Sequence, residues 1–178
     1  MSQNVENSYH SKSFTTVTGD SLDPDRVLSM LPLRPYHSIV DIGCGEGYFA
    51  VPLAKYVSQG KLFASDTNKK LLEICRSKLA EVHLDNVEVI HFRGKKLPIE
   101  TSSVDGALMA FTLNSTRDKY GIIAESKRFL QNGGWLAILD LYDSLDNDKV
   151  KQLGLDAGLR FVQQRDFDKN NYLILFRK

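Results

Sequence analysis

The chain of 178 residues has only two cysteines, almost no net charge and no long hydrophobic segment. Cys44 and Cys75 are too few for a disulfide framework and form no zinc-binding pattern, which is typical of proteins from a reducing compartment. A total of 23 Lys and Arg against 22 Asp and Glu leaves a net charge of +1. No overall field therefore directs the protein toward nucleic acid or an anionic membrane. We expect a cytoplasmic protein.

The sequence also lacks an apolar leader and a membrane-spanning segment. No apolar run approaches the ~20 residues that cross a bilayer, and residues 1–12 are polar where a signal peptide has an apolar core. Residues 1–19 are rich in Ser, Thr and Asn, and we expect residues 1–22 to form a flexible arm; the alternative is an arm that orders over a bound ligand. The remaining residues, 23–178, have the length of one domain.

Short apolar runs alternate with segments of helical periodicity after residue 23. The apolar runs predict strands at residues 38–42, 61–65, 86–92, 103–111 and 135–141. Helical spacing of apolar residues predicts helices at residues 24–31, 48–58, 68–82, 119–130 and 147–157. This alternation predicts an α/β fold, a doubly wound Rossmann-like sheet that is mostly parallel, with helices on both faces.

Two details of the second half refine this fold. The last apolar runs, residues 159–165 and 172–176, are separated by too few residues for a parallel crossover, so we expect an antiparallel hairpin at one edge of the sheet. The Asn-Gly-Gly sequence of residues 132–134 predicts the end of the preceding helix through left-handed conformations.

The clearest chemistry follows the first predicted strand. Gly43, Gly45 and Gly47 lie between a strand and a helix, where small residues let the backbone approach a ligand closely. Open α/β sheets bind ligands at the carboxyl ends of their strands. Asp66 ends the second strand, 21 residues after Gly45, and a carboxylate there can accept hydrogen bonds from both hydroxyls of a ribose.

Two cofactors share these requirements, a dinucleotide and S-adenosylmethionine. A dinucleotide needs the pattern G-x-G-x-x-G, so that its pyrophosphate meets the helix N-terminus. Here the third glycine comes one residue early, and Glu46 places a negative charge beside the pyrophosphate position. Both details favour S-adenosyl-L-methionine, which has cationic centres and no phosphate, with S-adenosyl-L-homocysteine as its product. An NAD-dependent oxidoreductase is the less favoured alternative.

Residues 40–47 resemble the first motif of the class I S-adenosylmethionine-dependent methyltransferases, hydrophobic-D-x-G-x-G-x-G. Residues 97–99 and 103–105, which read L-P-I and S-V-D, are similar to the L-P-F … S-F-D stretch of the ubiquinone/menaquinone-biosynthesis-type subgroup. Residues 129–135 resemble the L-K-P-G-G turn of the same subgroup. The resemblance spans residues 24–141 and implies the strand order 3-2-1-4-5-7-6, with the seventh strand antiparallel.

The resemblance also implies a cofactor site. Asp41 would lie beneath the methionine end of the cofactor and Asp66 would hold the ribose. Residues 93–97 would line the adenine, but they contain no acid, which many family members use there to accept from the exocyclic amine. We therefore expect backbone groups to read the adenine, with weaker binding. The implied cofactor-binding residues are Asp41, Gly43, Cys44, Gly45, Gly47, Asp66, Thr67, Gly94, Lys95, Leu97, Ala110 and Phe111.

The methyl acceptor has no comparable motif. In-line methyl transfer needs a base only if the acceptor must lose a proton, so no catalytic residue is assigned. Thr112 and Asn114 follow the predicted strand of residues 103–111. They could contact the acceptor, or they could simply form a solvent-exposed polar loop. Capping and solvation account for the acids of residues 140–148, so no metal is expected. We expect a small-molecule acceptor; the alternatives are an RNA or protein acceptor, or a cofactor-binding domain without activity.

Overall fold

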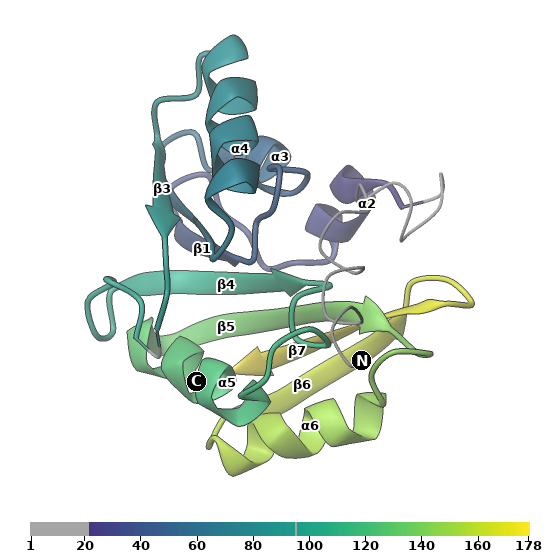
Figure 1. The fold of residues 1–178 in the computed structure, drawn as a ribbon. Helices are drawn as coiled ribbons and strands as arrows, with labels where there is room; N and C mark the ends of the chain where they lie inside the picture. Colours follow the sequence, from purple (N-terminus) through teal and green to yellow (C-terminus); the bar gives the residue numbers. More distant parts are fainter. Residues whose placement is uncertain (1–21, 95) are drawn as a thin grey trace, which may run out of the picture.

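A seven-stranded sheet runs through the computed structural model, which describes residues 22–94 and 96–178 (Figure 1). The strands are β1 (Ser38–Ile42), β2 (Lys61–Asp66), β3 (Val87–His91), β4 (Val104–Ala110), β5 (Leu130–Leu141), β6 (Arg160–Asp166) and β7 (Asn171–Arg177). The helices are α2 (Pro24–Ser29), α3 (Ala50–Tyr56), α4 (Lys69–Glu81), α5 (Lys119–Phe129) and α6 (Asn147–Asp156). Apart from the buried Leu22, the expected N-terminal arm lies outside the described residues.

The strands lie in the order β3-β2-β1-β4-β5-β7-β6. The pairs from β3 to β5 are parallel, and β7 is antiparallel to both β5 and β6. This confirms the doubly wound Rossmann-like fold and the strand order that the family resemblance implied. Because β5 and β6 are both antiparallel to β7, the carboxyl ends of β1 to β6 all point to one edge of the sheet.

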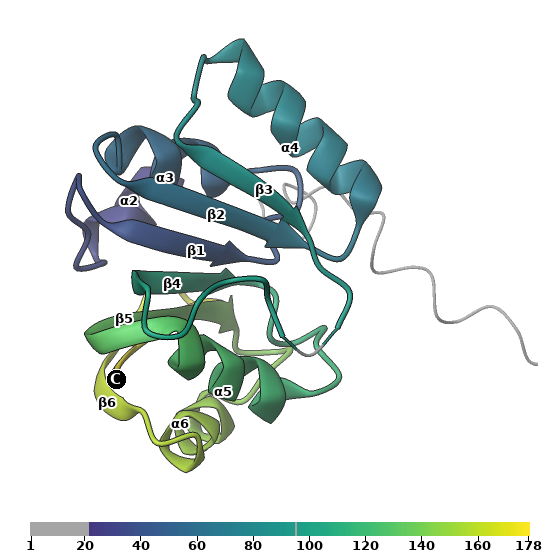
Figure 2. The same cartoon turned by 90° about the vertical axis from the view of Figure 1, so that its left-hand side faces the viewer.

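The helices form two layers, one on each face of the sheet (Figures 1 and 2). Helices α2, α3 and α4 cover one face, and α5 and α6 cover the other. Neighbouring strand residues alternate between the two faces, so Ile39 packs in one core and Val40 in the other. Each fully buried side chain of this size contributes roughly 1.5–3 kcal/mol. The two cores hold the carboxyl edge of the sheet rigidly in place.

Side-chain caps begin four of the helices. Oxygens of Asp23, Asn68, Asp118 and Asp146 accept backbone N–H groups at the starts of α2, α4, α5 and α6. Each such cap contributes about 1 kcal/mol. Among these elements, no helix of the described chain is long and apolar enough to cross a membrane.

The connection from α5 to β5 differs from the prediction. The helix ends at Phe129, and Leu130 already has extended backbone and begins β5. Gly133 does adopt a left-handed φ of +78°, but it lies within the strand. The pairing of β4 with β5 shifts register between Val104 and Gly106, and such a bulge accommodates the additional residues. The prediction that residues 132–134 end the helix is therefore wrong, because the helix stops before them and the glycine bends a strand.

Candidate cofactor site

The glycine-rich loop turns sharply at the carboxyl end of β1. Gly43, Gly45 and Gly47 have φ values of +75°, +54° and +88°, and glycine adopts this left-handed backbone without strain. The N–H groups of Gly43 and Cys44 donate to the carbonyl of Ser65 at 2.7 and 3.0 Å. These bonds fasten the loop to the end of the neighbouring strand, β2.

The first two glycines have different surroundings. A Cβ on Gly43 would lie 2.2 Å from Thr112 Oγ1, and this hydroxyl donates to the carbonyl of Ile42 at 3.0 Å. A Cβ on Gly45 would meet no heavy atom of the described residues within 4 Å. Gly43 therefore lets the segment after β4 pack against the loop, whereas Gly45 borders open space that a ligand can enter.

The third glycine and the loop cysteine pack inward against α4. A Cβ on Gly47 would lie 2.9 Å from Cys75 Sγ. Cys44 and Cys75 are both free and buried. A hydrogen bond with Cys75, together with burial, raises the pKa of the Cys44 thiol far above its ordinary value. Cys44 is thus a neutral thiol, and thiols in this form are weak nucleophiles.

Asp66 occupies the end of β2 beside the loop. One carboxylate oxygen accepts the N–H of Gly45 at 2.9 Å, and the other accepts the N–H of Asn68 at 2.8 Å. Each carboxylate oxygen can accept a further hydrogen bond. Asp66 can therefore order the loop and still accept hydrogen bonds from a sugar.

Asp41 lies within β1 and is only 1% exposed. Its Oδ2 has no hydrogen-bond partner within residues 22–94 and 96–178. Burial, followed by the nearby Cys75 and Asp66, raises the pKa of Asp41 well above its ordinary value. An unpaired buried carboxyl is unfavourable by several kcal/mol, and a bound cation would remove that penalty. This orphaned oxygen and the space beside Gly45 fit a ligand with a positively charged amino group.

The other predicted residues lie at the same edge. Gly94 and Leu97 follow β3, while Ala110 ends β4 and Phe111 follows it; Lys95 is outside the described residues. Phe111 has a φ of +54°, a conformation that is unusual for an aromatic residue and concentrates at functional sites. The fold thus brings most of the described members of the predicted set to the carboxyl ends of β1 to β4, whereas the side chain of Leu97 is buried in the core and its N–H is hydrogen-bonded to Glu125 of α5.

Sequence reasoning missed the role of Asp140 at the end of β5. Its side chain is fully buried, and its two oxygens accept the N–H groups of Leu141 and Asn114 at 2.9 and 3.2 Å. Burial raises the pKa of Asp140 to about 6. Asp140 thereby holds the segment after β4 against β5. An acid at the end of an apolar run was the only sequence signal for it.

Polar side chains also meet at the carboxyl ends of β5 and β6. The hydroxyl of Tyr142 donates to the carboxylate of Asp166. Gln164 Nε2 donates to the Tyr142 hydroxyl at 3.1 Å, and its Oε1 accepts from Asn147 Nδ2 at 2.9 Å. This network adjoins the cofactor edge, because β6 ends at the same edge as β1 and β2.

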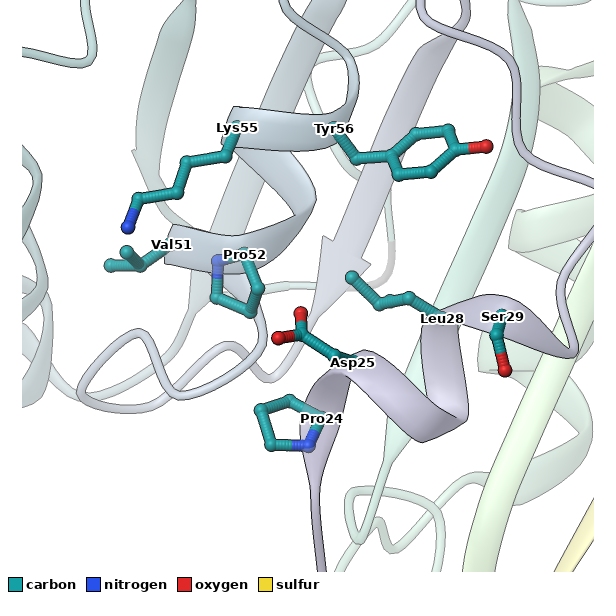
Figure 3. A pocket seen from close by; sticks show the side chains of 8 residues that line it. All are labelled: Pro24, Asp25, Leu28, Ser29, Val51, Pro52, Lys55 and Tyr56. Atoms are coloured by element: carbon teal, nitrogen blue, oxygen red, sulfur yellow. The ribbon is translucent and has the colours of Figure 1, made fainter.

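A groove of about 530 Å³ lies between α2 and α3. Figure 3 shows Asp25 and Leu28 pointing from α2 toward α3. The complete lining is Pro24, Asp25, Leu28, Ser29, Val51, Pro52, Lys55 and Tyr56. None of the predicted cofactor-binding residues is in this lining, so the groove is distinct from the site described above.

Comparisons with known proteins identify the family to which the chain belongs. Residues 40–138 match the family model described as "Methyltransferase domain". A demethylmenaquinone methyltransferase of Listeria monocytogenes is 30% identical over 114 residues, which are 64% of this chain and 48% of that protein. The chain thus spans about half the length of the curated relatives that it matches.

Solved structures are similar over most of the chain. A SAM-dependent methyltransferase from Aquifex aeolicus has a TM-score of 0.80 and 26% identity, covering 86% of this chain and 88% of that one. A putative methyltransferase from Bacillus halodurans has a TM-score of 0.79 over 88% of this chain and 98% of that one, and its 12% identity shows the fold alone. With the family match over more than half of its residues, the chain belongs to the methyltransferase-domain family, and its fold and cofactor are those of the class I S-adenosylmethionine-dependent methyltransferases.

Proposed function

We propose that this protein transfers a methyl group from S-adenosylmethionine to a small-molecule acceptor. The observation that carries the proposal is the buried side chain of Asp41, two residues before the glycine loop, whose Oδ2 finds no partner in the described part of the chain. A family member that had lost its cofactor would have no reason to keep an unpaired acid there, because its replacement by a neutral residue removes the penalty of burial.

Each predicted residue has a role in this proposal. Asp41 holds the amino group of the methionine end, and the loop from Gly43 to Gly47, with Cys44 packed beneath it, lies against the cofactor. Asp66 accepts the ribose hydroxyls while it fixes Gly45. Thr67, Gly94, Lys95 and Leu97 belong to the segments around the ribose and the adenine, and Ala110 and Phe111 flank the methionine moiety.

The protein acts mainly by alignment. The bound cofactor supplies a methyl group on a positively charged sulfur, which leaves as a neutral thioether. Holding donor and acceptor in line accounts for roughly 7–11 kcal/mol of barrier lowering in such reactions. Asp140 is fully buried and holds the segment after β4 through the N–H groups of Leu141 and Asn114, so we assign it a structural role and not that of a base. The acceptor would enter beside Asn114 and Tyr142, at the ends of β4 and β5.

The relatives provide a starting compound for the acceptor. Those at 30% identity carry the name demethylmenaquinone methyltransferase, so quinols of that type come first in a screen with a labelled methyl donor. Transfer of label to RNA or to protein in the same screen would replace the small-molecule proposal. Binding of the cofactor without transfer to any compound would leave a cofactor-binding domain without activity.

Isothermal titration calorimetry with S-adenosylmethionine and S-adenosylhomocysteine tests the cofactor site. Hydrogen bonds to a charged acceptor contribute roughly 1.5–3 kcal/mol each, so Asp66→Ala should raise the Kd for both ligands at least tenfold. Asp85→Ala is the matched control, since Asp85 is exposed and precedes β3 at the opposite edge of the sheet. Absence of binding to the wild-type protein would contradict the proposal, and equal affinity of the Asp66 variant would contradict the assignment of the ribose.

A further inference from the structure

The segment between β3 and Leu97 is fastened at both ends. At its start, the N–H of Phe92 donates to the carbonyl of Asp66 at 3.0 Å. At its end, the N–H of Leu97 donates to Glu125 Oε1 at 2.8 Å, and the carbonyl of Leu97 accepts from Arg128 Nη2 at 3.2 Å. Arg93 and Gly94 therefore follow one fixed point of the backbone, and Lys96 precedes the other.

Glu125 and Arg128 form one rigid unit on α5. Arg128 donates through Nε to one oxygen of Glu125 at 2.8 Å and through Nη2 to the other at 2.7 Å. Glu125 is 8% exposed, and a two-pronged pair of this kind is both strong and specific in geometry. The hydrogen bond with Glu125 raises the pKa of Arg128, so the guanidinium stays charged. Both oxygens of Glu125 are engaged within the protein.

The same end of α5 holds the chain beyond Leu97. Arg128 Nη1 donates to Thr101 Oγ1 at 3.2 Å, and the carbonyl of Arg128 accepts the N–H of Ser102 at 3.0 Å. The side chains of Leu97 and Ile99 are buried in the core on this face. The chain after residue 97 is thus fixed to α5, and Arg93, Gly94 and Lys96 are exposed before it.

These residues lie where an adenine would be placed. The segment begins with a hydrogen bond to the backbone of Asp66, whose side chain is the proposed ribose acceptor, and a base attached to that ribose would lie against the following residues. Residues 93–97 contain no acid, so the ring must be read by backbone groups. Backbone groups discriminate only when they are held in place before the ligand binds.

We propose that Glu125 and Arg128 are positioning residues: by holding the backbone of Leu97, they fix the approach to Gly94 and Lys96, whose backbone groups read the adenine ring. The inference rests on the proposed function, since it assigns a specificity determinant to the same cofactor site. Neither side chain touches the cofactor; both act through Leu97.

Comparing the affinities of two ligands that differ at the base distinguishes this positioning role from a general effect on the fold. S-adenosylhomocysteine and S-inosylhomocysteine differ only at the base, where the inosyl ligand has a carbonyl oxygen and an N1–H in place of the exocyclic amine and the unprotonated N1 of adenine. In the wild-type protein we expect the inosyl ligand to bind about tenfold more weakly, as measured by calorimetry. In Glu125→Ala we expect the Kd for S-adenosylhomocysteine to rise about tenfold while that for the inosyl ligand changes little, so the ratio falls toward one.

A conservative variant and two control variants complete the test. Glu125→Gln keeps one acceptor oxygen and should lie between the wild type and Glu125→Ala, which keeps the test usable if the alanine variant does not fold. Glu88→Gln removes a carboxylate that pairs with Lys61 at 2.7 Å on the exposed side of β3, and it should leave the ratio unchanged. Asp66→Ala should weaken both ligands by the same factor.

Three outcomes would overturn the inference. The first is a wild-type ratio near one, and the second is an equal loss of both ligands in Glu125→Ala and Glu125→Gln. The third is an unchanged ratio in folded variants, with folding checked by the melting temperature. Absence of binding of S-adenosylhomocysteine to the wild-type protein is distinct from all three, because it contradicts the proposed function itself.

Discussion

Asp41 and Asp140 are both buried near the carboxyl ends of strands, but their hydrogen bonding is opposite. Asp140 gives both oxygens to backbone N–H groups, of Leu141 and Asn114. Asp41 leaves Oδ2 without a partner among the described residues. They also lie on opposite faces of the sheet, because Asp41 shares its face with Ile39, whereas Asp140 shares the face of Ile138.

This difference in hydrogen bonding distinguishes an acid with a structural role, Asp140, from an acid available to bind a ligand, Asp41. An acid whose hydrogen bonds are satisfied by the chain itself stabilises a local arrangement, here the segment after β4. An acid left unsatisfied in a buried position lowers stability unless something binds to it. The hydrogen bonding of a buried carboxylate therefore indicates its function better than its burial does.

The largest expected effect comes from a substitution that creates a steric clash between the loop after β1 and the segment after β4. Gly43 follows the strand of Asp41, and Thr112 belongs to the segment that Asp140 holds. Gly43→Ala would place a Cβ 2.2 Å from Thr112 Oγ1 on a backbone with φ of +75°. We expect a loss of about 3 kcal/mol or more in the free energy of unfolding, measured by urea denaturation, together with loss of cofactor binding.

Gly45→Ala is the matched control for this steric effect. Gly45 also has a left-handed φ, but a Cβ there would meet no heavy atom of the described residues within 4 Å. We expect only the strain of about 1–2 kcal/mol for a left-handed alanine. Equal destabilisation by the two substitutions would show that the contact with Thr112 is not what requires glycine at position 43.

The second effect is a pH dependence of stability that the wild type has and Asp140→Asn lacks. The pKa of Asp140 is raised to about 6, so between about pH 4 and pH 6 the folded protein keeps a proton that the unfolded chain has lost. The resulting stabilisation is full below about pH 4 and is lost as the pH rises through 6. Relative to Asp140→Asn, the wild type should lose about 2–3 kcal/mol of unfolding free energy from pH 4 to pH 7.

Urea denaturation of the two proteins at several pH values measures this difference directly. The other carboxyl groups, Asp41 included, are common to both proteins and cancel in the comparison. Parallel curves for wild type and Asp140→Asn would mean that Asp140 titrates at its ordinary value despite its burial.

The smallest effect is the most specific for the ligand. Asp41→Asn removes the buried charge and should weaken S-adenosylhomocysteine about tenfold by calorimetry. The melting temperature at pH 7 should not fall, because a neutral amide is easier to bury than a carboxylate. Asp140→Asn should weaken binding less. The contrast between the two aspartates fails if Asp140→Asn loses more affinity than Asp41→Asn does.

Much of the fold could be predicted because its signals are local. The strand of residues 38–42 was predicted with the bounds that β1 has, and the caps at Asp23 and Asn68 follow from residue preferences at helix starts. The start of β5 was predicted too late, at residue 135, because the Asn-Gly-Gly sequence of residues 132–134 favours a turn in isolation, whereas pairing with β4 draws these residues into β5.

The residues of the candidate site were recognisable in the same way, since the glycine loop and Asp66 carry a pattern of fixed spacing. Their surroundings were not recognisable from the pattern. Leu97 meets Glu125 across 28 positions of the chain, Asn114 meets Asp140 across 26, and Thr112 meets the loop across about 70.

Residue order alone therefore determined the alternation of strands and helices, the place of the glycine loop and the acid that ends β2. The tertiary structure decided which buried acid is satisfied, which glycine is sterically required and which side chains hold the segment after β3. The physical reason is that backbone preferences and hydrophobic periodicity act over a few neighbouring residues, whereas hydrogen-bond satisfaction and close packing depend on the partners that folding brings together.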